Sequence, residues 1–300
     1  MTAVTLAPPR LGSLSPSRAS DFMSCPLKYR FRVVDRLPEP PSPAATRGTL
    51  VHAVLERLFD LPPVERSLPA ARALLEPEWR RLCDEDPALA GALFPERAGF
   101  AEWLASAGPL LEAYFALEDP GRLAPAAREL MVTHTTEAGL LLRGIVDRLD
   151  EAPPGSPRAG ALRVVDYKTG KAPGAAFESR VLFQMKFYAL VLWRSRGTVP
   201  ALLELLYLGG DAGERLRYQP DEAELRGFER TLHALGTAIA RAHSTGDWRA
   251  KRSRLCDWCS HQALCPEFGG TPPPLPAPRE GAEAPEAAAD DTVELVDVTG

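Results

Sequence analysis

The chain has 300 residues, of which 45% are hydrophobic and 25% are charged, and its formal net charge is −5. These values suit one large or two small globular domains with a proper core, and they exclude fibrous and wholly disordered proteins. The first twenty residues lack the apolar stretch of a signal peptide, and no segment approaches the roughly 18 apolar residues of a membrane span. We therefore expect a cytoplasmic protein without membrane contact.

The negative charge is concentrated at the end of the chain. Residues 269–300 hold seven acidic residues and one arginine, a net of −6, so residues 1–268 carry about +1. The Pro- and Ala-rich composition of 269–300 predicts a disordered tail behind a domain that spans residues 1–268. Basic residues cluster twice, at Lys28, Arg30, Arg32 and Arg36 and at Arg249, Lys251, Arg252 and Arg254. Such clusters can follow a phosphate backbone, although a solvated surface is the commoner explanation of a charge run.

The first half of the chain is predicted to be helical. Ser15 has the character of an N-cap followed by a proline, so a short helix is expected to end before Cys25. A second helix fits residues 46–60, with a broad apolar face that carries His52 at its edge. Residues 65–118 look helical and irregular, inside a segment, residues 60–125, that is expected to be a helical insertion.

Strands dominate the middle of the chain, over residues 126–136, 139–151 and 161–169. Residues 177–197 are apolar on nearly all sides and predict a buried helix. Two further strands, 200–208 and 214–219, and a long amphipathic helix, 221–244, complete the globular part. This order predicts an α/β fold with a mixed central sheet flanked by helices.

Asp166 and Lys168 end an apolar strand and point to the same face, because side chains alternate along a strand. The connector over residues 152–160 is rich in turn residues and predicts an antiparallel hairpin with the preceding strand. With the turn centred near Ser156 and Pro157, Asp147 falls opposite Asp166. Directly opposed carboxylates destabilise a sheet unless one is protonated, Lys168 compensates, or a divalent cation lies between them.

The same register gives consistent neighbours on both faces of the hairpin. Leu149 falls opposite Val164 on the buried side, and Asp150 falls opposite Arg163 as a surface ion pair. Paired carboxylates are hard oxygen ligands that suit Mg²⁺ or Mn²⁺, and Lys168 could hold or activate a water beside such an ion. An ordinary surface hairpin, with Lys168 as a simple ion-pair partner, remains the alternative.

Three more polar residues, His52, Gln184 and Tyr188, are candidates for the same site. His52 is an imidazole ligand for a borderline ion such as Mn²⁺, although a lone histidine at the edge of an apolar face is more often packed. Gln184 and Tyr188 share one face of the apolar helix and need polar partners there. A phosphate, a base or a catalytic carboxylate would serve, as would internal hydrogen bonds in the core.

Five cysteines give the second strong signal. Cys256, Cys259 and Cys265 have the spacing C-x2-C-x5-C, and Cys25, just before a proline, is the natural fourth ligand of a tetrathiolate site. Cys83 is then an ordinary buried thiol. Three clustered thiolates with a distant fourth fit a [4Fe-4S] cluster better than zinc, which usually takes two close pairs. Zinc remains an alternative, either with the four cysteines or in a mixed site of His261 and three of them. In either case the site would join the two ends of the domain, and we call it the clasp.

Together these features resemble the RecB-like nucleases of the PD-(D/E)XK superfamily, in the iron–sulfur branch found in the AddB nuclease subunit and in CRISPR-associated exonucleases. The resemblance covers most of residues 14–268. It rests on the cysteine in SDFMSCPLKYRF, the histidine in RGTLVH, the aspartate in GIVDRLD, D-x-K in VVDYKTG, Q-x3-Y in QMKFY, and the final C-x2-C-x5-C-P. Valine stands where the superfamily signature has the proline before its aspartate, and residues 60–125 match no motif.

The resemblance implies a restriction-endonuclease-like core with a metal centre and a cluster. Asp147, Asp166, the Tyr167 carbonyl and His52 would bind Mg²⁺ or Mn²⁺, and Lys168 would orient or deprotonate the attacking water. Gln184 and Tyr188 would position DNA or the catalytic groups. The cluster ligands would be Cys25, Cys256, Cys259 and Cys265.

The expected function is therefore metal-dependent DNA hydrolysis by an exonuclease, in DNA repair, recombination or end processing. Single-stranded DNA or DNA with free ends is the expected substrate, with a separate helicase as a candidate partner. The chain has no G-x4-G-K-[ST] phosphate loop, so it should not be a motor by itself. The alternatives are a non-catalytic nucleic-acid-binding or scaffolding subunit and a sequence-specific endonuclease.

Overall fold

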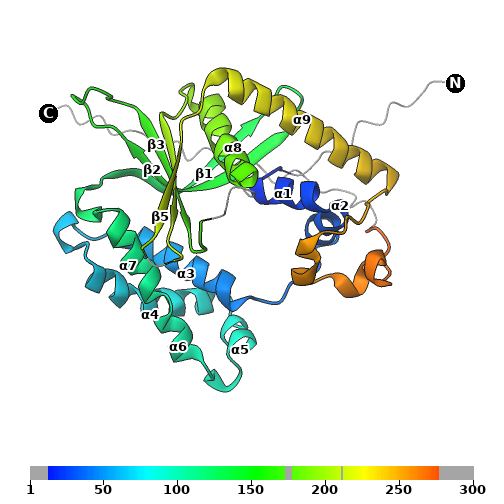
Figure 1. The fold of residues 1–300 in the computed structure, drawn as a ribbon, viewed down its shortest axis with the longest axis horizontal. Coiled ribbons are helices and arrows are strands. Elements are labelled where there is room, and N and C mark those ends of the chain that lie inside the picture. Colours follow the sequence, from blue (N-terminus) through cyan, green and yellow to red (C-terminus); the bar gives the residue numbers. More distant parts are fainter. Residues whose placement is uncertain (1–12, 173–177, 211, 277–300) are drawn as a thin grey trace.

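A computed structural model of the chain describes residues 13–172, 178–210 and 212–276, with the backbone alone at 178–180. Most of the predicted tail, residues 277–300, lies outside the described residues. The structure is an α/β fold in which a five-stranded sheet is covered on both faces by helices (Figure 1). The helices are α1 (Pro16–Ser24), α2 (Pro26–Tyr29), α3 (Pro43–Leu58), α4 (Leu68–Glu85), α5 (Leu89–Leu93), α6 (Phe100–Ala105), α7 (Gly108–Leu117), α8 (Glu178–Arg196) and α9 (Glu222–Thr245).

Short helical turns connect the longer helices and form the end of the described chain. They are the π-helical turn η1 (Arg30–Val34) and the 3-10 turns η2 (Pro63–Glu65), η3 (Pro95–Arg97), η4 (Pro120–Arg122), η6 (Arg254–Trp258), η7 (Gln262–Leu264) and η8 (Pro266–Phe268). None of the helices in the described residues is long and apolar enough to cross a membrane.

The strands are β1 (Pro125–Thr135), β2 (Leu141–Glu151), β3 (Leu162–Lys168), β4 (Leu202–Tyr207) and β5 (Glu214–Tyr218), and they lie in the sheet in this order. β3 and β4 are parallel and all other neighbours are antiparallel, so the sheet is mixed. α8 makes the crossover between the two parallel strands, as a parallel pair requires. The mixed sheet flanked by helices confirms the predicted fold class.

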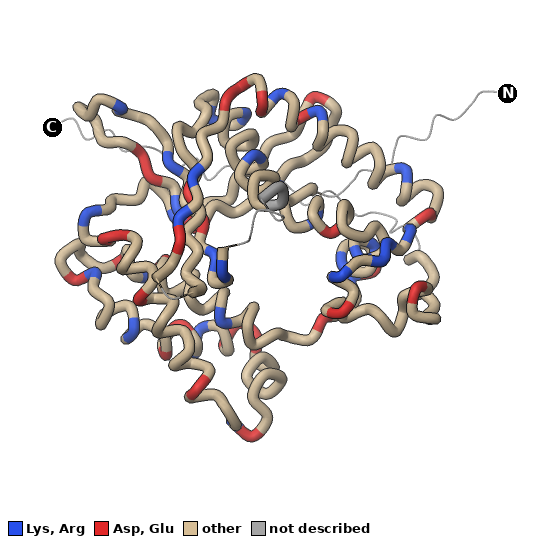
Figure 2. Tube along the Cα trace, viewed as in Figure 1, with Lys and Arg blue, Asp and Glu red and all other residues tan. Residues whose placement is uncertain are grey.

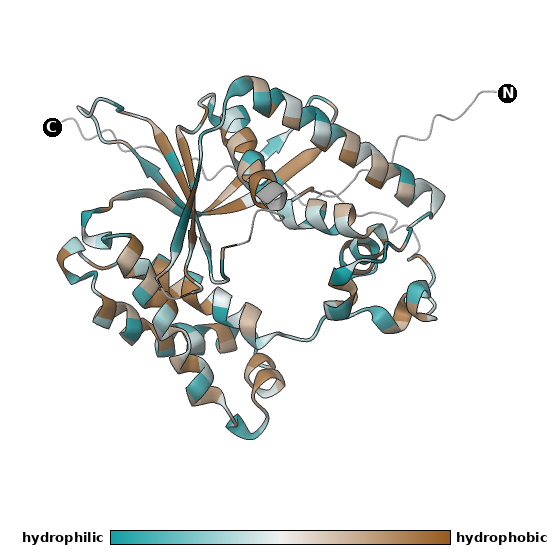
Figure 3. Cartoon of the chain, in the orientation of Figure 1, coloured by the Kyte–Doolittle hydropathy of each residue, from teal (hydrophilic) through white to brown (hydrophobic). Residues whose placement is uncertain are grey.

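Each face of the sheet has its own hydrophobic core. Val164 of β3 packs with residues of α8 and α9, whereas its neighbour Val165 packs with residues of α3, α4 and α7. This alternation follows from the pleat of a strand. α8 is buried from Phe187 to Trp193 without a break, as its apolar sequence predicted, and Figure 3 shows it brown over most of its length.

Capping explains where the helices begin. Ser15 accepts the N–H of Arg18, as the sequence predicted for the start of α1. α3 begins three residues earlier than expected, because Ser42 accepts the N–H of Ala45 and Pro43 occupies the first helical position. The segment 60–125 is helical, as predicted, and covers one face of the sheet as α4 to α7.

The predicted hairpin register is confirmed over four pairs, but the ladder stops one residue short of the predicted pair of Asp147 and Asp166. Leu149 pairs with Val164 and Asp150 with Arg163, and the ladder continues to Arg148 and Val165, where it ends. The Arg163 guanidinium lies 2.7 Å from Asp150. This ion pair is more buried than expected, because it belongs to a larger network under the helical layer. The candidate site lies beyond the last pair, at the middle of β2 and the end of β3.

Candidate active site

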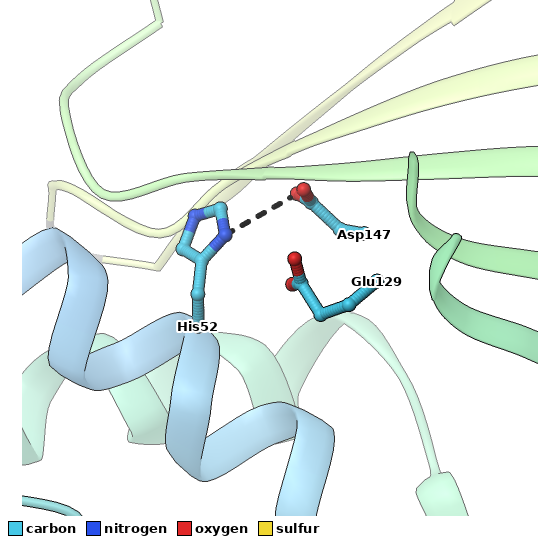
Figure 4. A group of neighbouring side chains, drawn as sticks. All are labelled: His52, Glu129 and Asp147. Carbon is cyan, nitrogen blue, oxygen red and sulfur yellow. Dashed lines mark ion pairs between the residues drawn. The ribbon is translucent and has the colours of Figure 1, made fainter. Parts of the chain in front are cut away.

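Three side chains from three elements meet where β2 and β3 separate. His52 comes from α3, Glu129 from β1 and Asp147 from β2, and their ligand atoms all lie within 4.8 Å of one another (Figure 4). No other group of three His, Cys, Asp or Glu residues in the described chain is this close. One imidazole and two carboxylates at such spacing can bind a single cation.

Tyr167 holds two of these ligands through its backbone. Its N–H donates to Oδ2 of Asp147 at 2.6 Å, and its carbonyl oxygen lies 2.9 Å from Nε2 of His52. Nδ1 of His52 lies 3.5 Å from the same Asp147 oxygen. The predicted ligand set of His52, Asp147 and the Tyr167 carbonyl is thus brought together at one place.

Asp166 lies buried beside this group. Gln184 donates to its Oδ1 at 2.9 Å, and the ammonium of Lys168 lies 2.6 Å from its Oδ2. Burial raises the pKa of Asp166 to about 6, against the opposing charge of Lys168 and with support from the charge of Asp147. The two predicted carboxylates therefore interact, and Lys168 forms the ion pair that the sequence analysis kept as its alternative.

Glu129 and His52 also shift each other's pKa. Loss of hydration raises the pKa of Glu129 to about 7, assisted by the negative charge of Asp147, although the side chain still reaches solvent. Burial lowers the pKa of His52, but the hydrogen bond and charge of Asp147, with Asp166 and Glu129, outweigh it and leave a raised value. Crowded carboxylates thus favour a positive partner at this place.

The site opens into a cleft of ≈ 610 Å³. His52, Glu129 and Lys168 line it, together with Thr169 and Tyr207. Its volume lies in the range of ligand-binding clefts, which is about 300–1,000 Å³. A substrate phosphate can therefore reach Glu129 and Lys168 from solvent, whereas Asp147 and Asp166 lie behind the residues that line the cleft.

Gln184 and Tyr188 of α8 approach the site from the other face of the sheet, where α8 packs. The Gln184 amide donates to Asp166 and also to the Tyr188 hydroxyl, at 3.1 Å. α8 can approach the sheet because Gly144 has no side chain: a Cβ there would lie 2.8 Å from Cε1 of Tyr188. Their proposed roles toward DNA stay predictions.

Glu129 was not found from the sequence. It has φ of 44°, in the left-handed region that residues with a Cβ avoid. Arg128 pairs with Arg148 and Leu130 with Val146, so Glu129 falls opposite Asp147. Counting back from the turn between β1 and β2, as was done for the next hairpin, would have revealed this position.

The four predicted cluster cysteines gather at the far side of the α1 and α2 helices. Cys25 lies between these two helices, and Cys256, Cys259 and Cys265 lie in the turns from η6 to η8; all four line one cavity. Burial raises the pKa of the Cys265 thiol, and the charges of the other three cysteines add to the shift. Cys83, on α4, does not line this cavity.

The thiols are spread more widely than a closed zinc site. Tetrahedral zinc with bonds of about 2.3 Å places its sulfurs about 3.8 Å apart. In the described part of the chain no three cysteine sulfurs lie within 4.8 Å of one another. His261 is buried and has its Nε2 3.0 Å from a carboxylate oxygen of Glu39, so only its other nitrogen remains for a metal.

The two basic clusters have different surroundings. In the first, Lys28 and Arg32 both pair with Asp21, and the buried Arg30 pairs with Asp35. In the second, exposed Lys251, Arg252 and Arg254 form no ion pair with the described residues. Figure 2 shows this gathering of blue segments beside α2. Arg249 pairs with Asp247, but the other three cations of the second cluster keep their positive charge available to an anion.

Comparisons with solved structures return distant matches. One is a "Putative exonuclease" from Eubacterium rectale, at 13% identity and a TM-score of 0.49, covering 83% of this chain and 88% of the other. Another is the protein SSO0001, at 17% identity and a TM-score of 0.35, covering 66% of this chain and 81% of the other. No curated protein matches the sequence.

The family comparison covers almost the whole described domain. The model of the PD-(D/E)XK nuclease superfamily matches residues 13–266, the part of the chain that holds the mixed sheet, the carboxylates at its edge and Lys168. Members of this superfamily hydrolyse nucleic acid esters with divalent metal ions. The chain belongs to the PD-(D/E)XK nuclease superfamily.

Proposed function

We propose that the chain is a metal-dependent deoxyribonuclease that hydrolyses phosphodiester bonds in the cleft where β2 and β3 separate. The observation that carries the proposal is the convergence of His52, Glu129 and Asp147 within 4.8 Å, beside the buried Asp166. Carboxylates crowded in this way are stabilised by a divalent cation, and oxygen donors with one imidazole suit Mg²⁺ or Mn²⁺.

The residues present fit such an ion. His52, Asp147, Asp166 and the Tyr167 carbonyl would hold it, and Glu129 adds a carboxylate that the sequence did not reveal. The buried Asp166 Oδ2 has the ammonium of Lys168 as its partner at 2.6 Å, and Gln184 donates to the other oxygen, so the carboxylate is held in place beside the proposed ion. A bound divalent ion would stabilise negative charge on the scissile phosphate and lower the pKa of a water.

Lys168 would orient or deprotonate the attacking water, and its pairing with Asp166 holds it at the site. In the reaction the water oxygen forms a bond to phosphorus, the bond from phosphorus to the leaving oxygen breaks, and the leaving oxygen gains a proton. Gln184, bound to Asp166 and Tyr188, would keep the α8 face of the site in place.

More specifically, we propose that the chain acts as an exonuclease in DNA repair, recombination or end processing. The order of the sequence motifs supports this choice, which includes single-stranded DNA or DNA with free ends as substrate and a separate helicase as partner. A cytoplasmic location fits the same role. A scaffolding subunit that binds nucleic acid without cleaving it, and an endonuclease, are the rivals.

A nuclease assay tests the proposal and separates the rivals. Linear end-labelled single- and double-stranded DNA and closed circular DNA are incubated with Mn²⁺ or Mg²⁺, or with chelator, for the wild type and Lys168→Ala. Lys171→Ala is the matched control, because Lys171 is exposed in the loop that follows β3 and makes no ion pair with the described residues.

If the chain is an exonuclease, we expect metal-dependent degradation of linear DNA, loss of this activity in Lys168→Ala and Asp166→Ala, and wild-type rates in Lys171→Ala. Binding of DNA without cleavage under all metal conditions would establish the scaffolding rival. Cleavage of closed circular DNA would establish the endonuclease.

We further propose that Cys25, Cys256, Cys259 and Cys265 hold a [4Fe-4S] cluster, with zinc as the less favoured ion. Their position around one cavity supports a shared ligand, and the sequence pattern of three clustered cysteines with a distant fourth favours a cluster over zinc. The site would clasp the turns after α9 to the start of the chain, and its role would be structural.

The clasp also offers a surface for a DNA strand. Trp258 is 78% exposed, and Arg252 lies 5.2 Å above the ring of Phe268. Exposed aromatic rings among unpaired cations are the arrangement that binds single strands, since bases stack on the rings and phosphates meet the cations. This surface would hold the strand outside the metal site.

A further inference from the structure

Tyr167 contacts both ligands that meet at the end of β3, and it does so in three ways. Its N–H binds Asp147 and its carbonyl oxygen binds His52, at 2.6 and 2.9 Å. Its aromatic ring also meets the imidazole of His52 edge to face, with ring centroids 5.8 Å apart. Any shift of this one residue therefore moves two candidate metal ligands together.

The side chain of Tyr167 leaves the site and enters the core under the helical layer. Its hydroxyl accepts a hydrogen bond from Nη1 of Arg148 at 2.8 Å. Arg148 is wholly buried, which is rare for an arginine and costs free energy unless the guanidinium is fully paired. The hydroxyl is thus fixed to a group that has little freedom of its own.

Two carboxylates hold Arg148 in one orientation. Glu118 accepts from Nη1 at 2.8 Å and from Nη2 at 3.0 Å, and Asp150 accepts from Nε at 3.0 Å and from Nη2 at 3.1 Å. The guanidinium also lies 5.6 Å from the centre of the Phe59 ring. Such two-point pairing fixes a guanidinium in position and in angle.

Glu118 connects this arrangement to the helical segment. It lies at the C-terminal end of α7 and is buried, with 5% of its side chain exposed. The segment 60–125 carries no recognisable motif, yet its last helix delivers the carboxylate on which Arg148 depends. The contacts from Glu118 through Arg148 to Tyr167 thus run along the face of the sheet that the helical layer covers and end at the two ligands.

We propose that Glu118 and Arg148 are positioning residues, which fix Tyr167 and through it the metal-binding geometry of His52 and Asp147. The inference rests on the proposed metal site and gives the helical segment a role in it. Partners of metal ligands commonly change metal affinity or activity by 10- to 100-fold when removed, and displacements near 1 Å can have similar effects on rate.

The Tyr167→Phe variant tests the proposal, because it removes only the hydroxyl and keeps the ring and the backbone. We expect the Kd for Mn²⁺, measured by titration without DNA, to rise about tenfold. We also expect kcat on linear DNA at saturating Mn²⁺ to fall about tenfold, with KM for DNA changed less than about twofold. Glu118→Gln should change the same two quantities in the same direction.

The matched control is Glu204→Gln. Glu204 is a buried carboxylate of the same ion network on β4, and it pairs with Arg163, Arg215 and Arg217. It makes no hydrogen bond or ion pair with Arg148 or Tyr167 among the described residues, although its partner Arg163 also lies 3.4 Å from Glu118. It should lower the melting temperature about as much as Glu118→Gln does, while the Kd for Mn²⁺ and kcat stay at the wild-type values.

Three results would overturn the proposal. The first is Tyr167→Phe with wild-type Kd for Mn²⁺ and wild-type kcat. The second is Glu204→Gln with the same losses as Glu118→Gln, because the effect would then follow stability alone. The third is a wild type that neither binds Mn²⁺ nor cleaves DNA, which would remove the proposed metal nuclease as well. In the first two cases an active wild type leaves the proposed function intact.

Discussion

The carboxylate of Asp147 accepts the backbone N–H of Tyr167 at 2.6 Å, just beyond the last backbone pair of β2 and β3. A side chain thus continues the hydrogen bonding where the ladder has ended. Because the strands separate there, Asp147 and Asp166 stay near each other without being closed in by further pairing. Only about 10% of the Asp147 side chain and 5% of the Asp166 side chain are exposed there, so a cation between them would bind in a largely buried site.

Metal affinity should depend on pH in a direction that follows from these carboxylates. The pKa is about 7 for Glu129 and about 6 for Asp166 in the metal-free protein, so both hold protons at low pH and must lose them when metal binds. We expect the Kd for Mn²⁺ to fall as pH rises from about 5.5 to about 8, and then to level off. Calorimetric titrations in two buffers of different ionisation enthalpy measure both the Kd and the protons released.

Glu129→Gln is the control for this prediction. The variant should bind Mn²⁺ more weakly and release fewer protons near pH 7. Without metal it should gain stability relative to the wild type as pH rises from 4.5 toward 7, because the wild-type carboxyl has a higher pKa folded than unfolded and is increasingly disfavoured there. The same pH dependence in wild type and variant would contradict the assignment of Glu129 to the site.

Gly144→Ala should damage the site from the α8 side. The added Cβ would lie 2.8 Å from Cε1 of Tyr188, so α8 or the ring must move, and overpacking of this kind costs about 1–3 kcal/mol. Gln184, which joins Tyr188 to Asp166, would be displaced with it. We expect a lower melting temperature together with a reduced kcat on linear DNA.

A glycine with free space around it provides the comparison. Gly91 on α5 has no atom within 4 Å of the position that an added Cβ would take, and alanine is the better helix former. Gly91→Ala should keep kcat and keep or raise the melting temperature. If Gly144→Ala kept both quantities as well, the close packing of α8 on β2 would not support the site.

The hairpin and the helix α8 could be predicted from sequence because their signals are local. The turn at 152–160 and the alternation around Leu149 and Val164 set the register, and an uninterrupted apolar run marks a buried helix. Glu129 was missed because β1 alternates polar residues like a solvated strand, and only its pairing with β2 reveals what it faces. Arg148 looks like a surface residue, since its partner Glu118 is separated from it by thirty residues and an intervening strand.

The first basic cluster shows the same limitation. A run of cations does not reveal the distant acids that neutralise it, and Asp21 does so for Lys28 and Arg32. In the second cluster only Arg249 pairs with an acid among the described residues, namely the nearby Asp247. The difference depends on tertiary contacts and could not be deduced from residue type or spacing.

Purification without oxygen should yield brown protein that contains iron and sulfide. Cys25→Ser should remove the colour and lower the melting temperature, because the cluster would close a loop of more than two hundred residues. Absorption spectra, iron and sulfide analysis and thermal unfolding measure these changes. Colourless protein with stoichiometric zinc would contradict the cluster.

Cys83→Ser is the matched variant for the clasp. Cys83 is a partly buried thiol on α4 that does not line the cavity of the other four cysteines. Its replacement should leave the iron content unchanged, with at most a small loss of stability. Loss of the colour in Cys83→Ser would require a different set of ligands.

DNA binding at the clasp should depend on Trp258 and Arg252. Base stacking on an aromatic side chain contributes about 1–3 kcal/mol, so Trp258→Ala should weaken binding of single-stranded DNA by at least about fivefold. Arg252→Ala should reduce the slope of log K against log salt by about one, because one phosphate contact is lost. Fluorescence anisotropy in the presence of chelator measures both effects and is independent of cleavage.

Two exposed residues far along the chain from the clasp serve as controls for the DNA surface. Val64 is 93% exposed on η2, and Arg80 is an exposed cation on α4 that pairs with Glu76. Val64→Ala and Arg80→Ala should keep both the affinity and the salt slope, because neither side chain belongs to the clasp. If Trp258→Ala and Arg252→Ala behaved like these two variants, the strand would have to bind elsewhere, and the exposed aromatic ring of the clasp would have no part in holding it.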